Sequence, residues 1–232
     1  MQLWLCPVVA FLSGSIPFGL MIARMKGIDI RAHGSGNIGA TNVLRVVGKQ
    51  YGITCLILDA LKGFIPVALA VNLVQIVGRP VQIPLEFLDG FALKLPETEA
   101  FTAQLAHIAT ALAAVLGHNY SPWVGFKGGK GIATSAGVLL GLMPFAVLIL
   151  IALWLLVFAV TRYVSVASVL ASCALPVLTL WGSWHHGRIQ DGTWNKPLFA
   201  FSLIIALMAT WKHRTNFQRL REGTEHRFGK KS

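Results

Sequence analysis

Long apolar runs alternate with short polar segments along the 232 residues of this chain. A straight helix needs about 20 apolar residues to cross the hydrocarbon core of a membrane. Runs that approach or exceed this length occupy residues 3–23, 52–77, 101–117, 132–161, 164–182 and 197–211. The pattern predicts an all-α membrane protein that crosses the bilayer several times.

The fourth run is too long for one straight span, and Met143-Pro144 interrupts it. It could form one kinked helix or two short spans, since proline removes a helical hydrogen bond. Lysine and arginine concentrate in cytoplasmic segments of membrane proteins. With two spans and an outside N-terminus, most cations lie inside, and the outside loops hold only Arg79, Lys94, Arg188 and Lys196.

The sequence therefore predicts a single domain of residues 1–232, with the N-terminus outside and the C-terminus in the cytoplasm. Its seven expected spans are residues 3–23, 52–77, 101–117, 132–143, 145–161, 164–182 and 197–211. Residues 132–143 would extend only about 18 Å, against a core of about 30 Å. We therefore expect short or partly re-entrant segments near the cytoplasmic face, with residues 118–131 below the membrane surface.

Composition agrees with a membrane protein rather than a nucleic-acid-binding protein. Charged residues make up 12% of the chain, about half the fraction typical of soluble domains. The net charge is +11, but the cations lie in short segments between apolar runs, as topology signals do. The three cysteines lie within apolar runs and show no disulfide or zinc spacing.

The first candidate site is the segment Gly34-Ser35-Gly36-Asn37-Ile38-Gly39-Ala40-Thr41-Asn42, followed by Arg45. Glycines allow consecutive backbone amides to point into one concavity that binds an anion. Side-chain donors and a fixed positive charge would add to that binding. A glycine-rich turn between two spans is the simpler alternative, although a turn rarely needs this many donors.

The second candidate is Phe126-Lys127-Gly128-Gly129-Lys130-Gly131, a second combination of glycines and cations. It is not a Walker A loop, because Gly131 stands where a serine or threonine would bind magnesium. A cationic loop that only sets topology is the alternative. Glycines argue against that alternative, since topology requires charge alone.

Other polar residues carry weaker signals. His213 and Asn216 would share a helix face, as would Ser165 and Ser168. Asp59 and Lys62 lie three residues apart within the second expected span. Charges inside a membrane invite a functional interpretation. A mutual ion pair near the membrane edge is an equally good explanation.

Five motifs in order resemble the bacterial PlsY family, the acyl-phosphate:glycerol-3-phosphate acyltransferases. They are Leu12–Gly19, Gly34–Arg45, Gly117–Thr134, Arg162–Ser168 and His213–Asn216. The resemblance implies transfer of an acyl group from acyl phosphate to glycerol 3-phosphate, giving lysophosphatidic acid and phosphate. It implies no cofactor and no metal, and a multi-pass location in the bacterial cytoplasmic (inner) membrane. The lipid bilayer is an expected partner, as is the enzyme that makes acyl phosphate; nucleic acid is not.

Two substrate sites follow. Density of donors on a glycine-bearing backbone predicts an acyl-phosphate site at Ser35, Gly36, Asn37, Gly39, Thr41, Asn42, Gly128 and Gly129. The resemblance implies a glycerol 3-phosphate site at Arg45, Lys130, Ser168, His213 and Asn216. The expected catalytic residues are Ser35, Arg45, Lys130, His213 and Asn216.

The motifs contain no carboxylate to act as a base. Neutral His213 or a phosphate oxygen of a substrate could accept the proton, and the resemblance favours the phosphate. The competing function is a transporter or channel for a phosphorylated or anionic solute. Such proteins also break helices at membrane depth, but this sequence shows no inverted repeat.

Overall fold

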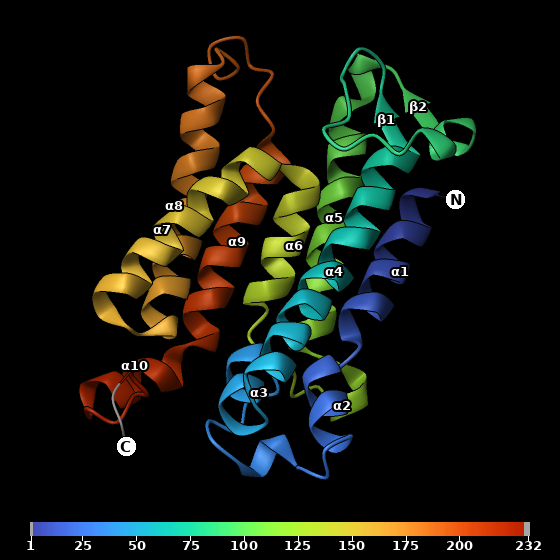
Figure 1. Cartoon of the computed structure of the whole chain (residues 1–232). Coiled ribbons are helices and arrows are strands. Elements are labelled where there is room, and N and C mark those ends of the chain that lie inside the picture. The colour runs from blue at the N-terminus through green and yellow to red at the C-terminus, as the bar shows by residue number, and fades with distance from the viewer. Residues whose placement is uncertain (1, 230–232) are drawn as a thin grey trace. The chain divides into compact units, whose positions relative to one another are not determined.

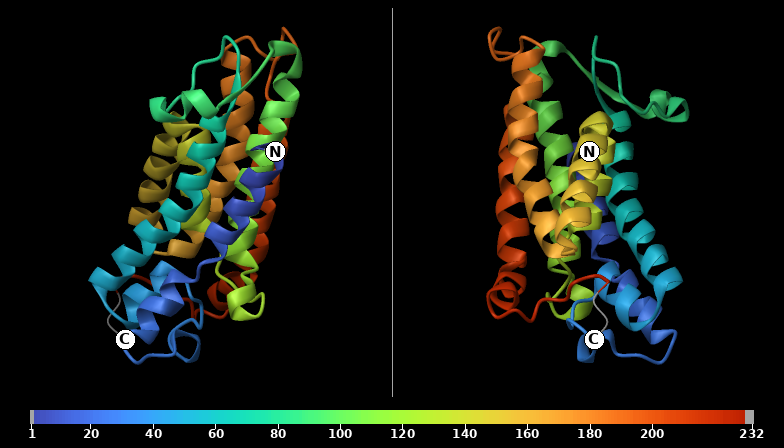
Figure 2. Two further views of the ribbon diagram at one scale, coloured as in Figure 1. Left: turned by 90° about the vertical axis from the view of Figure 1, so that its right-hand side faces the viewer. Right: turned by 60° about the vertical axis from the view of Figure 1, so that its left-hand side comes forward.

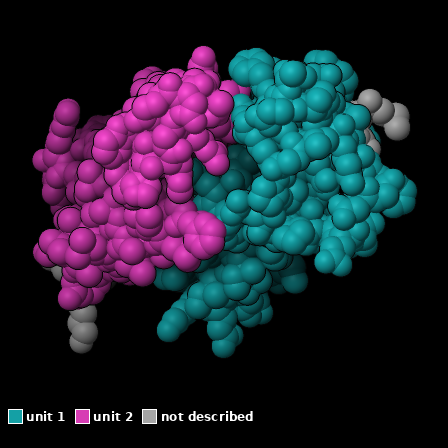
Figure 3. All heavy atoms as spheres, turned by 90° about the horizontal axis from the view of Figure 1, so that it is seen from above, with its two compact units in different colours: residues 1–144 teal, residues 145–232 magenta. Residues whose placement is uncertain are grey.

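The computed structural model describes residues 2–229 and is helical along most of that range (Figure 1). Packing divides the chain into two compact units, which meet in sequence at Pro144 and Phe145 (Figure 3). The first unit contains α1 (Gln2–Ser15), α2 (Phe18–Arg24), α3 (Ala40–Val46), α4 (Lys49–Leu73), α5 (Ala100–Asn119) and α6 (Ile132–Leu142). The second contains α7 (Pro144–Thr161), α8 (Val164–His185), α9 (Lys196–Lys212) and α10 (Arg214–Arg221).

The prediction of an all-α membrane protein is confirmed. Five helical segments among the described residues are long and apolar enough to cross a membrane: Leu3–Arg24, Lys49–Leu73, Glu97–Val124, Pro144–Thr161 and Val164–His185. Ile132–Leu142 is a shorter apolar helix, in agreement with the expected short fourth segment. The count of seven spans, the orientation of the termini and the single domain stay predictions.

The fourth apolar run forms two helices, not one kinked helix. α6 ends at Leu142 and α7 begins at Pro144. Met143 between them has a non-helical backbone, with φ −153° and ψ 69°. The residue before a proline disfavours the helical region, so the break follows from local sequence.

The first expected span, residues 3–23, agrees with the apolar segment Leu3–Arg24, but its helix is interrupted. α1 ends at Ser15, and α2 begins at Phe18 after Ile16 and Pro17. Pro17 has no backbone N–H, and the next donor, the N–H of Phe18, turns back to the carbonyl of Ile16 at 3.1 Å. The chain therefore changes direction where the first motif lies.

Glycines allow the helices of the first unit to pack closely. α1 packs on α5, and α4 packs on α6. A Cβ at Gly14 would collide with the carbonyl oxygen of Ala114, and one at Gly137 with the carbonyl oxygen of Ala60. Small residues at such contacts are typical of helices associating in lipid.

A small sheet joins the end of the second expected span to the outside loop that follows it. Strand β1 (Val74–Ile76) pairs in parallel with β2 (Leu93–Leu95), so the second apolar run ends as a helix at Leu73, before residue 77. Buried Asn72 organises the connection, because its Oδ1 accepts the N–H of Leu85 (2.8 Å) and its Nδ2 donates to the carbonyl of Ile83 (3.0 Å).

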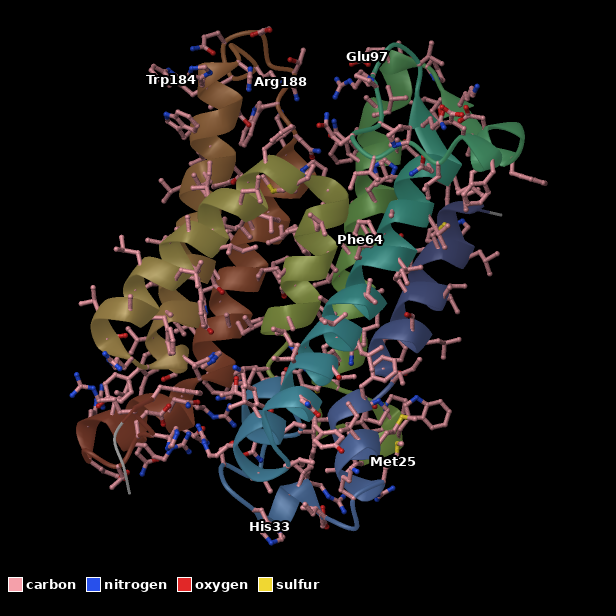
Figure 4. All side chains as sticks on the ribbon, in the orientation of Figure 1. Met25, His33, Phe64, Glu97, Trp184 and Arg188 are labelled. Atoms are coloured by element: carbon pink, nitrogen blue, oxygen red, sulfur yellow. The ribbon has the colours of Figure 1, made fainter. Side chains whose placement is uncertain are left out.

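Each unit has two distinct ends. In the first unit, Met25 and His33 lie at one end, Glu97 lies at the other, and Phe64 lies between them (Figure 4). In the second unit, α10 lies at one end, and the loop after Trp184 with Arg188 lies at the opposite end (Figures 2 and 4). The chain after α10 returns to the α7–α8 connection, where the N–H of Phe228 donates to the carbonyl of Arg162 at 3.0 Å.

Candidate functional site

The first glycine-rich segment forms a loop around the side chain of Asn42 in α3, which is 2% exposed. Asn42 Oδ1 accepts the N–H of Ser35 at 2.9 Å. Its Nδ2 donates to the carbonyls of Ile30 (3.3 Å) and His33 (3.0 Å). Gly34 has a φ of +60°, where a Cβ would also collide with the Asn42 amide. Asn42 therefore shapes the loop from within.

Asn37 closes the next turn of the same loop. Its Oδ1 accepts the N–H of Gly39, the residue that precedes α3, at 2.8 Å. Both ends of the Asn42 amide bind the backbone, whereas the contact described for Asn37 involves only its side-chain oxygen. Ser35 and Gly36 are exposed at the tip of this loop. These two residues form the accessible part of the predicted anion site.

Thr41 and Arg45 lie one helical turn apart on α3 and are both half-buried. Side chains at this spacing share a helix face. The helix directly after the loop therefore presents a hydroxyl donor and a positively charged guanidinium on one face. This face can offer hydrogen bonds and charge to a phosphate.

The second glycine-rich segment lies against the C-terminal end of α5. The N–H of Gly129 donates to the carbonyl oxygen of His118 at 3.1 Å. A Cβ at Gly128 would collide with that same carbonyl, and a Cβ at Gly129 would collide with the His118 ring. Glycine is therefore required at both positions by close packing. Half-buried Lys130 follows immediately and leads into α6.

The two glycine-rich loops lie at the same end of the first unit, opposite the small sheet (Figure 1). This end carries Ser35, Thr41, Arg45 and Lys130, four of the residues predicted from sequence. Ser168, His213 and Asn216 belong to the second unit. The roles of all these residues stay predictions.

His213 lies between α9 and α10 and is 3% exposed. Its Nδ1 is 2.7 Å from the carbonyl oxygen of Ala209. A carbonyl oxygen can only accept, so Nδ1 carries a proton. In the neutral ring, Nε2 is consequently the nitrogen with the lone pair. It can accept a hydrogen bond, or a proton, from a hydroxyl group.

Asn216 is held by Glu225, a residue outside the five motifs. Its Nδ2 donates to Glu225 Oε1 at 2.6 Å. The same oxygen accepts the hydroxyl of Ser165 (2.8 Å), and Oε2 accepts Arg219 Nε (2.8 Å). The side chain of Glu225 is 7% exposed. Glu225 therefore fixes the orientation of Asn216.

The environment of Glu225 also favours its charged form. Burial on its own raises the pKa of the carboxyl group. The hydrogen bonds from Asn216, Ser165 and Arg219 outweigh that effect, and the pKa lies below its ordinary value. No motif in the sequence signals this role, because the three donors lie up to 60 residues away along the chain.

Ser168 is 2% exposed in α8. Its hydroxyl oxygen accepts the indole N–H of Trp154 from α7 at 3.1 Å. A hydroxyl that accepts one hydrogen bond still has its own proton to donate. Trp154 therefore orients the Ser168 hydroxyl.

Comparison with known proteins identifies relatives along nearly the whole chain. The sequence profile of a family described as glycerol-3-phosphate acyltransferase matches residues 4–223. A glycerol-3-phosphate acyltransferase of Geobacter sulfurreducens is 43% identical over 221 residues, which cover 95% of this chain and 94% of that protein. One of Sinorhizobium medicae is 40% identical over 227 residues, covering 97% of this chain and 92% of that protein.

Two crystal structures of PlsY (YgiH), an integral membrane glycerol 3-phosphate acyltransferase, are also similar. The glycerol 3-phosphate form has a TM-score of 0.78 and 35% identity, and covers 99% of this chain and 96% of its own. The lysophosphatidic acid form has a TM-score of 0.75 and 34% identity, with the same coverage.

Proposed function

The chain belongs to the glycerol-3-phosphate acyltransferase (PlsY) family, and from that premise we propose how its residues perform the reaction. The protein is an integral membrane enzyme that acylates glycerol 3-phosphate and makes lysophosphatidic acid. This is the first acylation of phospholipid synthesis. The enzymatic interpretation of the sequence therefore replaces that of a transporter or channel.

The acyl donor is acyl phosphate in this proposal. The observation that carries it is the pair of glycine-rich loops at one end of the first unit. The loop tip with Ser35 and Gly36 and the adjoining Thr41 offer donors to the phosphate group. Asn37, Gly39 and Asn42 hold that loop in shape, and Gly128 and Gly129 hold the second.

Acyl phosphate is a mixed anhydride, so phosphate is a good leaving group. A hydroxyl oxygen of glycerol 3-phosphate attacks the acyl carbon, and the bond from that carbon to the phosphate oxygen breaks. The hydroxyl proton passes to a base, and inorganic phosphate departs. The protein mainly has to hold the reactants in line and neutralise negative charge.

Glycerol 3-phosphate is assigned to Arg45, Lys130, Ser168, His213 and Asn216. Its phosphate is a dianion, and the two cations supply compensating charge. The side chains of His213 and Asn216 are already held by Ala209 and Glu225. Groups that are fixed before the substrate binds lose little entropy on binding, which favours both affinity and alignment.

The proton acceptor in this proposal is a phosphate oxygen of a bound substrate. Phosphate has a second pKa of about 6, which makes it a competent base near neutral pH. Because His213 Nδ1 is protonated, its Nε2 can accept a hydrogen bond from the second hydroxyl of glycerol 3-phosphate, the one that does not attack. His213 then orients the substrate, and the proton of the attacking hydroxyl remains directed at the phosphate oxygen.

We further propose seven spans, with the N-terminus outside and the C-terminus in the cytoplasm, in the inner membrane of a bacterium. The cation distribution supports this orientation. It places both glycine-rich loops in the cytoplasm, where phosphorylated metabolites are made. The enzyme that supplies acyl phosphate is the partner expected there.

Purified protein in detergent tests the reaction directly. With hexadecanoyl phosphate and glycerol 3-phosphate, we expect release of inorganic phosphate matched by equal formation of lysophosphatidic acid. Omission of glycerol 3-phosphate should suppress both products. Turnover with acyl-CoA but none with acyl phosphate would refute the proposed donor.

A further inference from the structure

Two opposite charges are buried together in α4, within the first unit. Asp59 Oδ1 and Lys62 Nζ lie 2.7 Å apart, and the side chains are each 3% exposed. Burial removes both groups from water, and an apolar pair of similar size often gives equal or greater stability. The pair therefore calls for a role other than stability.

Lys62 connects α4 to the break in the first span. Its Nζ donates to the carbonyl oxygen of Ile16 at 2.7 Å and lies 5.5 Å from the centre of the Phe18 ring. Both contacts fix the start of α2. In α2, a Cβ at Gly19 would collide with the carbonyl oxygen of Ile38. Ile38 lies in the first glycine-rich loop, so the position of α2 sets the position of that loop.

Asp59 faces the second glycine-rich loop through His118. Its Oδ1 lies 3.7 Å from His118 Nδ1. The His118 carbonyl accepts the N–H of Gly129 at 3.1 Å, and the His118 ring packs directly on Gly129. A shift of His118 would therefore move Gly129 and, with it, the adjoining Lys130.

These contacts meet in one place. Asp59, Lys62 and His118 line a single small recess together with Gly19 and Ile38. The ion pair thus lies at the junction of α2, α4 and α5. The first glycine-rich loop contacts α2 at Gly19, and the second contacts α5 at His118. An ammonium group can reach the Ile16 carbonyl while its carboxylate partner faces His118, and an apolar pair could do neither.

We propose that Asp59 and Lys62 are positioning residues for acyl transfer, because their buried ion pair fixes both glycine-rich loops relative to each other. The inference rests on the proposed function, in which these loops carry the reacting phosphates. Small misplacement of reacting groups lowers turnover by up to about 100-fold. Loss of the pair should therefore lower kcat and leave the folding stability unchanged.

A neutral double variant separates positioning from stability. Asp59→Asn with Lys62→Met removes both charges, so neither is left buried alone. We expect an unchanged midpoint of thermal unfolding in detergent and a kcat reduced about tenfold or more. Asp59→Asn with Lys62→Gln keeps an N–H donor near Ile16 and should retain more kcat than the methionine variant.

The matched control is Arg79→Met with Glu97→Gln, which removes the ion pair at the opposite end of the same unit. Its kcat should equal that of the unmodified protein. The proposal would be overturned if the methionine double variant had the same thermal stability and the same kcat as the unmodified protein. Unfolding of both neutral double variants would overturn it too, because the pair would then serve stability.

Gly39→Leu, measured in parallel, distinguishes this inference from the assignment of the site. If Gly39→Leu retains normal turnover, the proposed role of the first loop is wrong. If Gly39→Leu is inactive while the methionine double variant is folded and fully active, only the positioning role of Asp59 and Lys62 is wrong.

Discussion

Replacing Glu225 by glutamine should weaken the binding of glycerol 3-phosphate although Glu225 is not assigned to touch it. The carboxylate holds Asn216 Nδ2 at 2.6 Å and Ser165 Oγ at 2.8 Å through one oxygen. Its other oxygen holds Arg219 Nε at 2.8 Å. Glutamine keeps one acceptor but turns an N–H group toward Arg219. Asn216 would then lose part of its support.

The size of the effect follows from these contacts. A hydrogen bond to a charged group contributes about 1.5–3 kcal/mol and a neutral one about 1 kcal/mol, so the two bonds to Oε1 together lose about 1–4 kcal/mol. Arg219 is 32% exposed, and such a pair contributes less than about 1 kcal/mol. We take a total of about 2 kcal/mol, in the lower part of the summed range. If all of it appeared in binding, KM for glycerol 3-phosphate would rise about 30-fold.

Steady-state kinetics at saturating acyl phosphate measure this rise. Glu222→Gln is the matched control, because Glu222 is exposed and accepts a hydrogen bond only from Gln218 among the contacts described. We expect an increase in KM of roughly 5-fold to 30-fold for Glu225→Gln and none for Glu222→Gln. Equal KM values for the two variants would refute the reasoning that Glu225 orients Asn216.

The lowered pKa of Glu225 also predicts that the folding stability depends on pH. Its pKa in the folded protein lies below the ordinary value, so it contributes stability above the ordinary glutamate range near about 4.3. That contribution is lost as the pH falls through the lower folded pKa. Glu225→Gln should lack this part of the acid-induced loss, as thermal unfolding measured from neutral to acidic pH would reveal.

Four further predictions address the loops, the cations, the base and the topology. Gly39→Leu should abolish turnover, because a side chain there crowds Asn37 Oδ1, whereas Gly90→Leu, where nothing lies within 4 Å of the new Cβ, should not. Arg45→Lys should raise KM for glycerol 3-phosphate about tenfold, since a lysine cannot bind phosphate in a bidentate manner, and an unchanged KM would contradict the assignment. His213→Asn should keep measurable turnover that saturates at higher glycerol 3-phosphate; a collapse of kcat with unchanged KM and pH-dependent rescue by imidazole would instead make His213 the base. Cysteines placed at Gly90 and at Ser232, which lies outside the described residues, should label from opposite sides of the membrane after Cys6 and Cys173 are replaced by serine. Labelling from one side would contradict the seven-span topology.

Apolar periodicity and proline placement predicted most of the helices. The runs that begin near residues 132, 145, 164 and 197 each form a helix within one residue of the expected start. Local rules suffice there, because an apolar segment in lipid satisfies its backbone groups only within a helix. The same rules located the break at Met143, since the residue before Pro144 avoids helical geometry.

Long-range contacts set the features that local rules missed. The break after Ser15 is stabilised by Lys62, whose ammonium binds Ile16 from 46 residues away in sequence. Asn42 carries a side chain that suits an anion site, yet its oxygen accepts the Ser35 N–H and its nitrogen donates to the carbonyls of Ile30 and His33. Composition indicates which groups can donate hydrogen bonds, but only the folded chain shows which of them are already used.

The two buried carboxylates described here bear on the question of the base. Asp59 is paired with Lys62, and Glu225 accepts hydrogen bonds from three side chains. The pKa of Glu225 is lowered by those bonds, so this group is a weaker proton acceptor than an ordinary glutamate. Each carboxylate thus contributes by holding another group in place. In the proposed reaction, phosphate is a good leaving group, and a substrate phosphate with a second pKa of about 6 accepts the proton that Glu225 is poorly suited to take.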